Sequence, residues 1–147
     1  MSIVIPESDL GRVMYTLFMN NSQKLEGTLL QNFTPLGKDK AKELQITDTV
    51  VGDGAEVPEN ATITAHYTGA LCADGTIFQS SHDFGDPATF GLNQVIKGWT
   101  KGVPGMKVGG TRRLVIPSAL AYGSARAASN IPSNSDLVFD IELVAVK

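Results

Sequence analysis

The sequence predicts an α+β fold in which an antiparallel sheet packs against one short helix, and three observations support this prediction. From residue 44 onward, apolar and polar residues alternate in short runs that glycine, proline or aspartate interrupts, as is typical of strands joined by turns. Residues 94–103 depart from this alternation and have a helical spacing. The last run, residues 137–146, places Asp140 and Glu142 on one face and apolar side chains on the other, which indicates a sheet with one solvated face.

The bounds of the strands follow from the residues that interrupt each run. Residues 44–51 end at a Gly-Asp-Gly turn, residues 62–68 end at a glycine, and residues 111–116 end at a proline. Residues 137–146 add a C-terminal strand. These runs predict strands of one antiparallel sheet.

The predicted helix lies within residues 94–103. Its apolar residues recur at spacings of three and four, and a Pro-Gly pair directly after the segment would end a helix. These apolar residues are Val95, Ile96, Trp99 and Val103. A helix packed on one face of the sheet leaves one end of the groove open, which is a favourable place for a shallow apolar pocket.

Trp99 is the only tryptophan of the chain. It ends the motif Val95-Ile96-Lys97-Gly98-Trp99, and a glycine-rich run follows it. So large a ring is most useful where it fills a core or forms the floor of a pocket. The residues around Trp99 leave both interpretations open.

The N-terminal residues are the least regular part of the sequence. The apolar stretch 13–19 fits a helix with Ser8 or Asp9 as its N-cap, and it equally fits a buried strand. We therefore expect an N-terminal extension of uncertain structure over residues 1–42 and one domain over residues 43–147. An exposed apolar stretch in a monomer is costly, so we expect it to pack on the domain, to pair with a second chain in an oligomer or to bind a client.

Composition argues against several classes of function. The formal net charge of −3 and the absence of a basic stripe argue against nucleic-acid binding. The lone Cys72 cannot form an intrachain disulfide, and His66 and His82 lack companions at metal-ligand spacing, so we expect neither a metal nor a cofactor. No apolar run approaches the roughly 18 residues needed to span a bilayer, and the first residues lack the basic start of a signal peptide. We expect a cytoplasmic protein without a membrane partner.

Separate motifs in residues 44–147 match one known family in order and in spacing. These motifs are Val51-Gly52-Asp53-Gly54, His66-Tyr67-Thr68-Gly69, Asp74-Gly75-Thr76-Ile77-Phe78, Val95-Ile96-Lys97-Gly98-Trp99, Gly105-Met106-Lys107-Val108-Gly109, Ala121-Tyr122-Gly123, Ile131-Pro132, and Leu137-Val138-Phe139-Asp140-Ile141-Glu142-Leu143. The segment resembles the FKBP-type peptidyl-prolyl cis-trans isomerases, and specifically a bacterial-like single catalytic domain with a short N-terminal extension. Several ordered motifs are far more specific than any one of them.

The resemblance implies a twisted antiparallel sheet of five or six strands wrapped around one short helix, with a proline pocket between them. It implies that six residues act on the substrate, with Trp99 as the floor, and that four more bind it. The six catalytic candidates are Tyr67, Phe78, Ile96, Trp99, Tyr122 and Phe139. The four substrate-binding candidates are Gln79, Phe90, Val95 and Ile131. The backbone N–H of Ile96 and the hydroxyl of Tyr122 would bind carbonyl groups of a proline-containing polypeptide.

The chemistry implied by the resemblance needs no covalent step. Rotation about a peptide bond meets a barrier of roughly 18–20 kcal/mol because the resonance of the amide is lost. A dry pocket disfavours the charge-separated planar amide, and tighter binding of the twisted form lowers the barrier. Neither a nucleophile nor a general base is therefore required.

Three departures from the family pattern bear on function. Gln79 stands where the family usually has Asp, so hydrogen-bonding capacity stays but the charge is lost, and macrolide inhibitors are expected to bind with reduced affinity. Ala88 replaces a common Phe, which would widen the groove. The loop 124–134 lacks the glycines and the Pro-Pro pair often found there, which affects substrate preference.

These departures leave a competing interpretation. Beside an active isomerase, the chain fits a proline-peptide-binding or chaperone-like module with weakened catalysis. A scaffold or assembly role of residues 1–42 is compatible with either.

Overall fold

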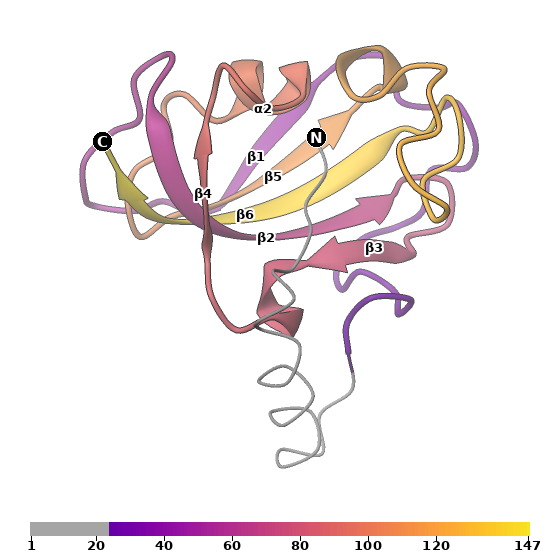
Figure 1. Ribbon diagram of the computed structural model, residues 1–147, viewed down its shortest axis with the longest axis horizontal. Coiled ribbons are helices and arrows are strands. Elements are labelled where there is room, and N and C mark those ends of the chain that lie inside the picture. Colours follow the sequence, from indigo (N-terminus) through magenta and orange to yellow (C-terminus); the bar gives the residue numbers. More distant parts are fainter. Residues whose placement is uncertain (1–23) are drawn as a thin grey trace.

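The computed structural model describes residues 24–147, so the apolar stretch 13–19 lies outside the described residues. Its main feature is one six-stranded antiparallel sheet with a short helix across one face (Figure 1). The strands are β1 (Gln45–Val50), β2 (Thr62–Leu71), β3 (Ile77–Ser80), β4 (Ala88–Gly91), β5 (Thr111–Ile116) and β6 (Leu137–Val146), and the helix is α2 (Lys97–Gly102). The predicted α+β fold is confirmed.

The order of the strands is β1-β5-β6-β2-β3, and β4 also pairs with β2. The two longest strands, β2 and β6, pair along their whole length at the centre, from Ile63 opposite Val146 to Leu71 opposite Leu137. The bounds of β5 and β6 coincide with the predicted runs, whereas β2 continues past Gly69. It continues because Ala70 and Leu71 still pair with β6.

The helix α2 is shorter than the predicted segment 94–103, because Val95 and Ile96 lie before it and the backbone at Ile96 is extended. Two glycines bring α2 close to β5. A Cβ atom on Gly98 would lie 2.5 Å from Ile116, and one on Gly102 would lie 2.8 Å from Leu114. Real Cβ atoms do not approach other atoms so closely, so these glycines set the distance between α2 and the sheet.

The main core lies between α2 and the concave face of the sheet. Its largest fully buried side chains are Trp99, Tyr67, Phe139, Ile63, Leu92, Leu114, Ile116, Leu137 and Ile141. A second buried cluster lies on the other side of the sheet and consists of Leu30, Ala70, Cys72, Ile77, Val115 and Val138. The expectation of one solvated face is therefore wrong for this part of the sheet, because residues before β1 cover it.

Residues 24–42, which we call the N-terminal strap, are held on the sheet by three charged side chains. The buried carboxylate of Asp83 accepts two backbone N–H groups at the start of the strap, at 2.7 and 3.0 Å. Arg113 donates to two carbonyls in its middle, at 2.6 and 3.0 Å. Asp136 accepts one N–H near its end, at 3.0 Å. The strap is thus fixed at several points along its length.

Candidate functional site

An aromatic cluster surrounds Trp99 in the main core. The Trp99 side chain is fully buried, and three rings meet it edge to face, with centroid distances of 5.8 Å for Tyr67, 5.4 Å for Phe90 and 5.3 Å for Phe139. Phe78 meets Phe139 in the same way at 5.6 Å. The rings come from β2, β4, β6, β3 and α2, so the fold gathers at one place residues that lie far apart in the sequence. Edge-to-face pairs of this kind fix the orientation of each ring.

A β-bulge in β3 brings two neighbouring residues to the concave face. Gln79 pairs with Gly69 and Ile77 pairs with Ala70, which leaves Phe78 as the extra residue. A Cβ atom on Gly69 would lie 2.5 Å from Phe78 and 2.6 Å from Phe139, so the missing side chain of Gly69 makes room for these rings. Because paired residues share a face, Gln79 lies on the same side of the sheet as the rings.

The remaining predicted residues pack against this cluster. Ile96 and Ile131 are buried in it, and Val95 and Tyr122 are half-buried at its edge. The structure therefore brings all ten predicted residues to one region, with Gln79 placed there by the bulge. Ala88 also packs against the main core, from β4, and offers no ring at that point.

Several donors in the cluster have no partner among residues 24–147. The Tyr67 hydroxyl and the indole Nε1–H of Trp99 are buried and make no hydrogen bond within this part of the chain. The backbone N–H of Ile96, just before α2, makes none there either. A buried donor without a partner costs about 1–3 kcal/mol, so native proteins keep few of them. Two such buried donors in one aromatic cluster, with the Ile96 N–H beside them, indicate a site for a ligand that carries acceptors.

Both tyrosines of the site are protonated at neutral pH, and burial raises the pKa of each further above that range. Burial, together with the neighbouring Tyr122 hydroxyl, raises the pKa of Tyr67 well above its ordinary value. Burial also raises the pKa of Tyr122. Both hydroxyls therefore remain donors at neutral pH.

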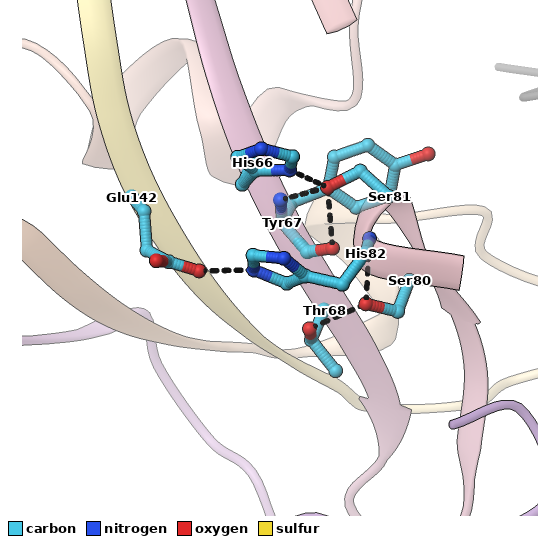
Figure 2. A network of polar contacts seen from close by, with 7 residues as sticks. All are labelled: His66, Tyr67, Thr68, Ser80, Ser81, His82 and Glu142. Atoms are coloured by element: carbon cyan, nitrogen blue, oxygen red, sulfur yellow. Dashed lines mark hydrogen bonds and ion pairs between the residues drawn. The ribbon is translucent and has the colours of Figure 1, made fainter. Parts of the chain in front are cut away.

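A polar network supports Tyr67 from the opposite side of the sheet (Figure 2). The buried Ser81 hydroxyl accepts the Tyr67 backbone N–H at 2.8 Å and donates to the Tyr67 carbonyl at 3.3 Å. His66 is hydrogen-bonded to the same hydroxyl at 2.9 Å, and its ring stacks on that of His82 at 4.2 Å. No local sequence pattern indicates this network, because it forms only when the turn that carries Ser81 and His82 folds back onto β2.

His82 ends the network on β6, where its Nε2 lies 2.5 Å from a carboxylate oxygen of Glu142. The two histidine rings thus stack on each other, and His82 also contacts an acidic side chain. Within residues 24–147 no group of three or more His, Cys, Asp and Glu side chains is arranged to hold a metal ion. No helix in this range is long and apolar enough to cross a membrane.

A cavity of about 310 Å³ lies apart from the aromatic cluster. It is lined by residues 37–39 of the N-terminal strap, by Leu71, Ala73 and Asp74, and by residues 132–136. None of the ten predicted site residues belongs to its lining. The donors and rings described above therefore define the candidate site, and this cavity does not.

The chain matches known proteins over most of its described length. Residues 54–144 match a family model described as FKBP-type peptidyl-prolyl cis-trans isomerase. An isomerase named FkpA from Aeromonas hydrophila is 45% identical over 130 residues, which are 88% of this chain and 48% of that protein. A protein named FK506-binding protein from Neisseria meningitidis is 47% identical over 105 residues, which are 70% of this chain and 95% of that protein.

Solved structures agree with the sequence matches. The crystal structure of FkpA from Escherichia coli superposes with a TM-score of 0.66 at 33% identity, over 95% of this chain and 60% of that one. The crystal structure of AtFKBP13 superposes with a TM-score of 0.62 at 40% identity, over 71% of this chain and 93% of that one. The chain spans about half the length of the FkpA protein from Aeromonas hydrophila.

Proposed function

Because the chain belongs to the family of FKBP-type peptidyl-prolyl cis-trans isomerases, we propose that the aromatic cluster around Trp99 accelerates rotation of X–Pro bonds in polypeptides. The observation that carries this proposal is the set of donors without partners among residues 24–147: the Ile96 N–H, the Tyr67 hydroxyl and the Trp99 indole N–H. They lie in and beside an apolar aromatic cluster, and recognition of a proline ring flanked by carbonyl groups requires such a combination of rings and donors.

In this proposal the site acts by binding alone. Trp99 forms the floor for the pyrrolidine ring, and Phe78, Phe90 and Phe139 hold it from the sides. The apolar surroundings weaken the resonance form that keeps the amide planar, so the twisted amide is favoured relative to either planar isomer. The Ile96 N–H and the Tyr122 hydroxyl bind carbonyls on either side of the proline and hold the chain while the bond rotates.

A protease-free assay of cis-to-trans conversion in a short Ala-Xaa-Pro-Phe peptide tests the proposal. We expect the wild-type chain at micromolar concentration to accelerate conversion well beyond the uncatalysed rate, whose time constant is tens to hundreds of seconds. Trp99→Leu keeps an apolar side chain but removes the floor and the indole donor, so it should lower kcat/KM roughly tenfold or more. The proposal would be wrong if the wild type does not accelerate the conversion. It would also be wrong if a stably folded Trp99→Leu protein accelerates the conversion as much as the wild type does.

A second candidate function is a proline-peptide-binding module with weakened catalysis. It is favoured by Gln79, which the bulge directs to the concave face where the family usually has Asp, and by Ala88, which leaves one wall without a ring. Peptide binding without measurable acceleration would support this candidate. Recovery of the rate in Gln79→Asp would then identify the lost carboxylate as the cause.

We also propose that macrolides of the FK506 type bind at the same site with reduced affinity. The supporting observations are the relative named FK506-binding protein and the neutral Gln79 beside Phe78. Titration with FK506, followed by Trp99 fluorescence, should show weaker binding to the wild type than to Gln79→Asp. Equal affinities of FK506 for the two proteins would show that Gln79 does not weaken macrolide binding.

The cytoplasmic location and the absence of a nucleic-acid partner expected from the sequence remain predictions. Cell fractionation and a binding assay with single- and double-stranded oligonucleotides test them. Oligomerisation through residues 1–42 likewise remains a prediction.

A further inference from the structure

The loop that leads into β6 is attached to the sheet by one side chain. Within it, residues 124–130 are exposed. The amide Nδ2–H of Asn130 donates to the backbone carbonyl of Phe78 at 2.9 Å. No other hydrogen bond in residues 24–147 joins residues 124–130 to a segment outside this loop. Asn130 is therefore the polar link between this loop and β3.

The acceptor of this bond is available because of the bulge in β3. Phe78 is the extra residue there and has no paired partner in β2. Its carbonyl accepts a bond from a residue 52 positions away in the sequence. The attachment point lies directly before Gln79 and on the residue whose ring contacts Phe139.

The link holds residues that belong to the candidate site. Ile131 follows Asn130 directly and is 6% exposed, packed in the main core. At its base the loop is closed by the N–H of Asn134, which donates to the carbonyl of Gly123 at 2.8 Å, next to Tyr122. The loop is thus fastened at its base and at Asn130, and it is exposed between these two points.

We propose that Asn130 is a positioning residue for substrate binding, which holds the loop so that Ile131 and Tyr122 are already in position before the polypeptide binds. This inference rests on the proposed function. Asn130 acts through Phe78 and Ile131. A loop without this link must be ordered at each binding event, and the lost conformational entropy weakens binding. The effect falls on the ground state and the transition state alike, so it changes KM and leaves kcat unaltered.

The kinetic test compares Asn130→Ala with Ser129→Ala in the full-length chain. The Ser129 side chain lies next in the loop, and only its backbone carbonyl is used, by Arg126 at 3.1 Å. One hydrogen bond contributes about 0.5–1.5 kcal/mol, so Asn130→Ala should raise KM roughly threefold to tenfold at unchanged kcat. Ser129→Ala should match the wild type. Asn130→Asp, which has the same shape but no donor when ionised, should behave like Asn130→Ala.

A second measurement reports on the loop without substrate. Hydrogen exchange of the backbone amides in residues 124–131 should be faster in Asn130→Ala than in the wild type and Ser129→Ala, at equal global stability. An unchanged KM, a fall in kcat alone, or equal exchange would overturn the proposal. If the wild type shows no isomerase activity, the proposed function fails, and the role of Asn130 is then tested by the Kd of a prolyl peptide. This Kd should rise in Asn130→Ala by the same factor as expected for KM. An unchanged Kd would overturn the role of Asn130.

Discussion

At the scale of single residues, Trp99 answers the question that the sequence leaves open. Its ring packs edge to face against Tyr67, Phe90 and Phe139, and its indole N–H is nevertheless without a partner among residues 24–147. Trp99 is thus a core residue and also offers a donor. Core and pocket are the same surface here, so a substitution that disturbs the rings should affect both stability and activity.

Gly69→Ala tests this connection without touching a donor. The new methyl group would lie 2.5 Å from Phe78 and 2.6 Å from Phe139, so both rings must shift. Overpacking of this kind costs about 1–3 kcal/mol. We expect a loss of that size in the free energy of unfolding, measured by urea denaturation, together with a fall in kcat/KM.

Gly85→Ala is the matched control for Gly69→Ala. Gly85 has a φ of +91° and open space where a Cβ would lie, so alanine there strains the backbone but leaves the aromatic rings in place. It should lose stability and keep kcat/KM. A Gly69→Ala protein with wild-type activity would show that the position of Phe78 and Phe139 is unimportant for the reaction.

At the scale of elements, the turn after β3 connects the site to titratable groups on the other side of the sheet. This turn is η2 (Ser81–Asp83). Ser81 is hydrogen-bonded to the backbone of Tyr67, the ring of His82 stacks on that of His66, and Asp83 accepts a hydrogen bond from the start of the N-terminal strap. A change of charge on His66 therefore acts on a turn that holds several parts of the fold.

Stability should decrease as the pH falls below about 6.5, the ordinary pKa of histidine. Burial first, and then the neighbouring His82, lower the pKa of His66, while Glu142 and Asp86 partly oppose this. The unfolded chain then binds a proton at a higher pH than the folded chain does, so stability is fully present above the unfolded pKa and is lost as the pH falls through the folded pKa. Urea denaturation between pH 7.5 and pH 5 measures the slope.

His66→Gln is the control for this pH dependence. Glutamine keeps a hydrogen-bonding group near Ser81 but does not titrate. The slope between pH 7.5 and pH 5 should become shallower in this variant. An unchanged slope would assign the pH dependence to other groups.

The elements also show where prediction from sequence succeeds. The bounds of β5 and β6 follow from the short runs predicted in the sequence, and the place of α2, though not its bounds, follows from the spacing in residues 94–103. The strands β3 and β4 have four residues each, too few for a periodic pattern to be distinctive. Asn130 and Ser81 act through contacts with residues far away in the sequence, so no local pattern identifies them.

At the scale of the whole molecule, the sheet has buried residues on both faces. One core surrounds Trp99, and the second consists of six residues, of which Leu30 comes from the N-terminal strap and the other five from the sheet and the turn after β2. Composition and periodicity predicted only the first. The strap contains no helix or strand, and its attachment depends in part on Asp83, Arg113 and Asp136, whose partners no spacing rule identifies.

Removal of residues 1–42 should therefore destabilise the fold. Leu30 is 8% exposed in the second cluster, and loss of such a buried side chain alone removes about 1.5–3 kcal/mol of hydrophobic stabilisation. We expect a loss of at least this size in chain 43–147 relative to the full-length chain. Equal stability would contradict the role of the strap.

Light scattering after size exclusion, on the same two chains, tests whether residues 1–42 also mediate oligomerisation. The predicted result is a larger assembly for the full-length chain than for chain 43–147. If both chains are monomeric, the prediction that the apolar stretch 13–19 pairs with a second copy is wrong.

The central claim is that the surface around Trp99 both binds an X–Pro segment and speeds its rotation. The most direct measurement is NMR of the full-length chain with a short prolyl peptide, because the only indole N–H signal belongs to Trp99. We expect this signal to shift on titration, and we expect exchange peaks that connect the cis and trans forms of the peptide at rates far above the uncatalysed rate. An indole signal that does not move, with cis and trans forms that exchange no faster than in free solution, would contradict it.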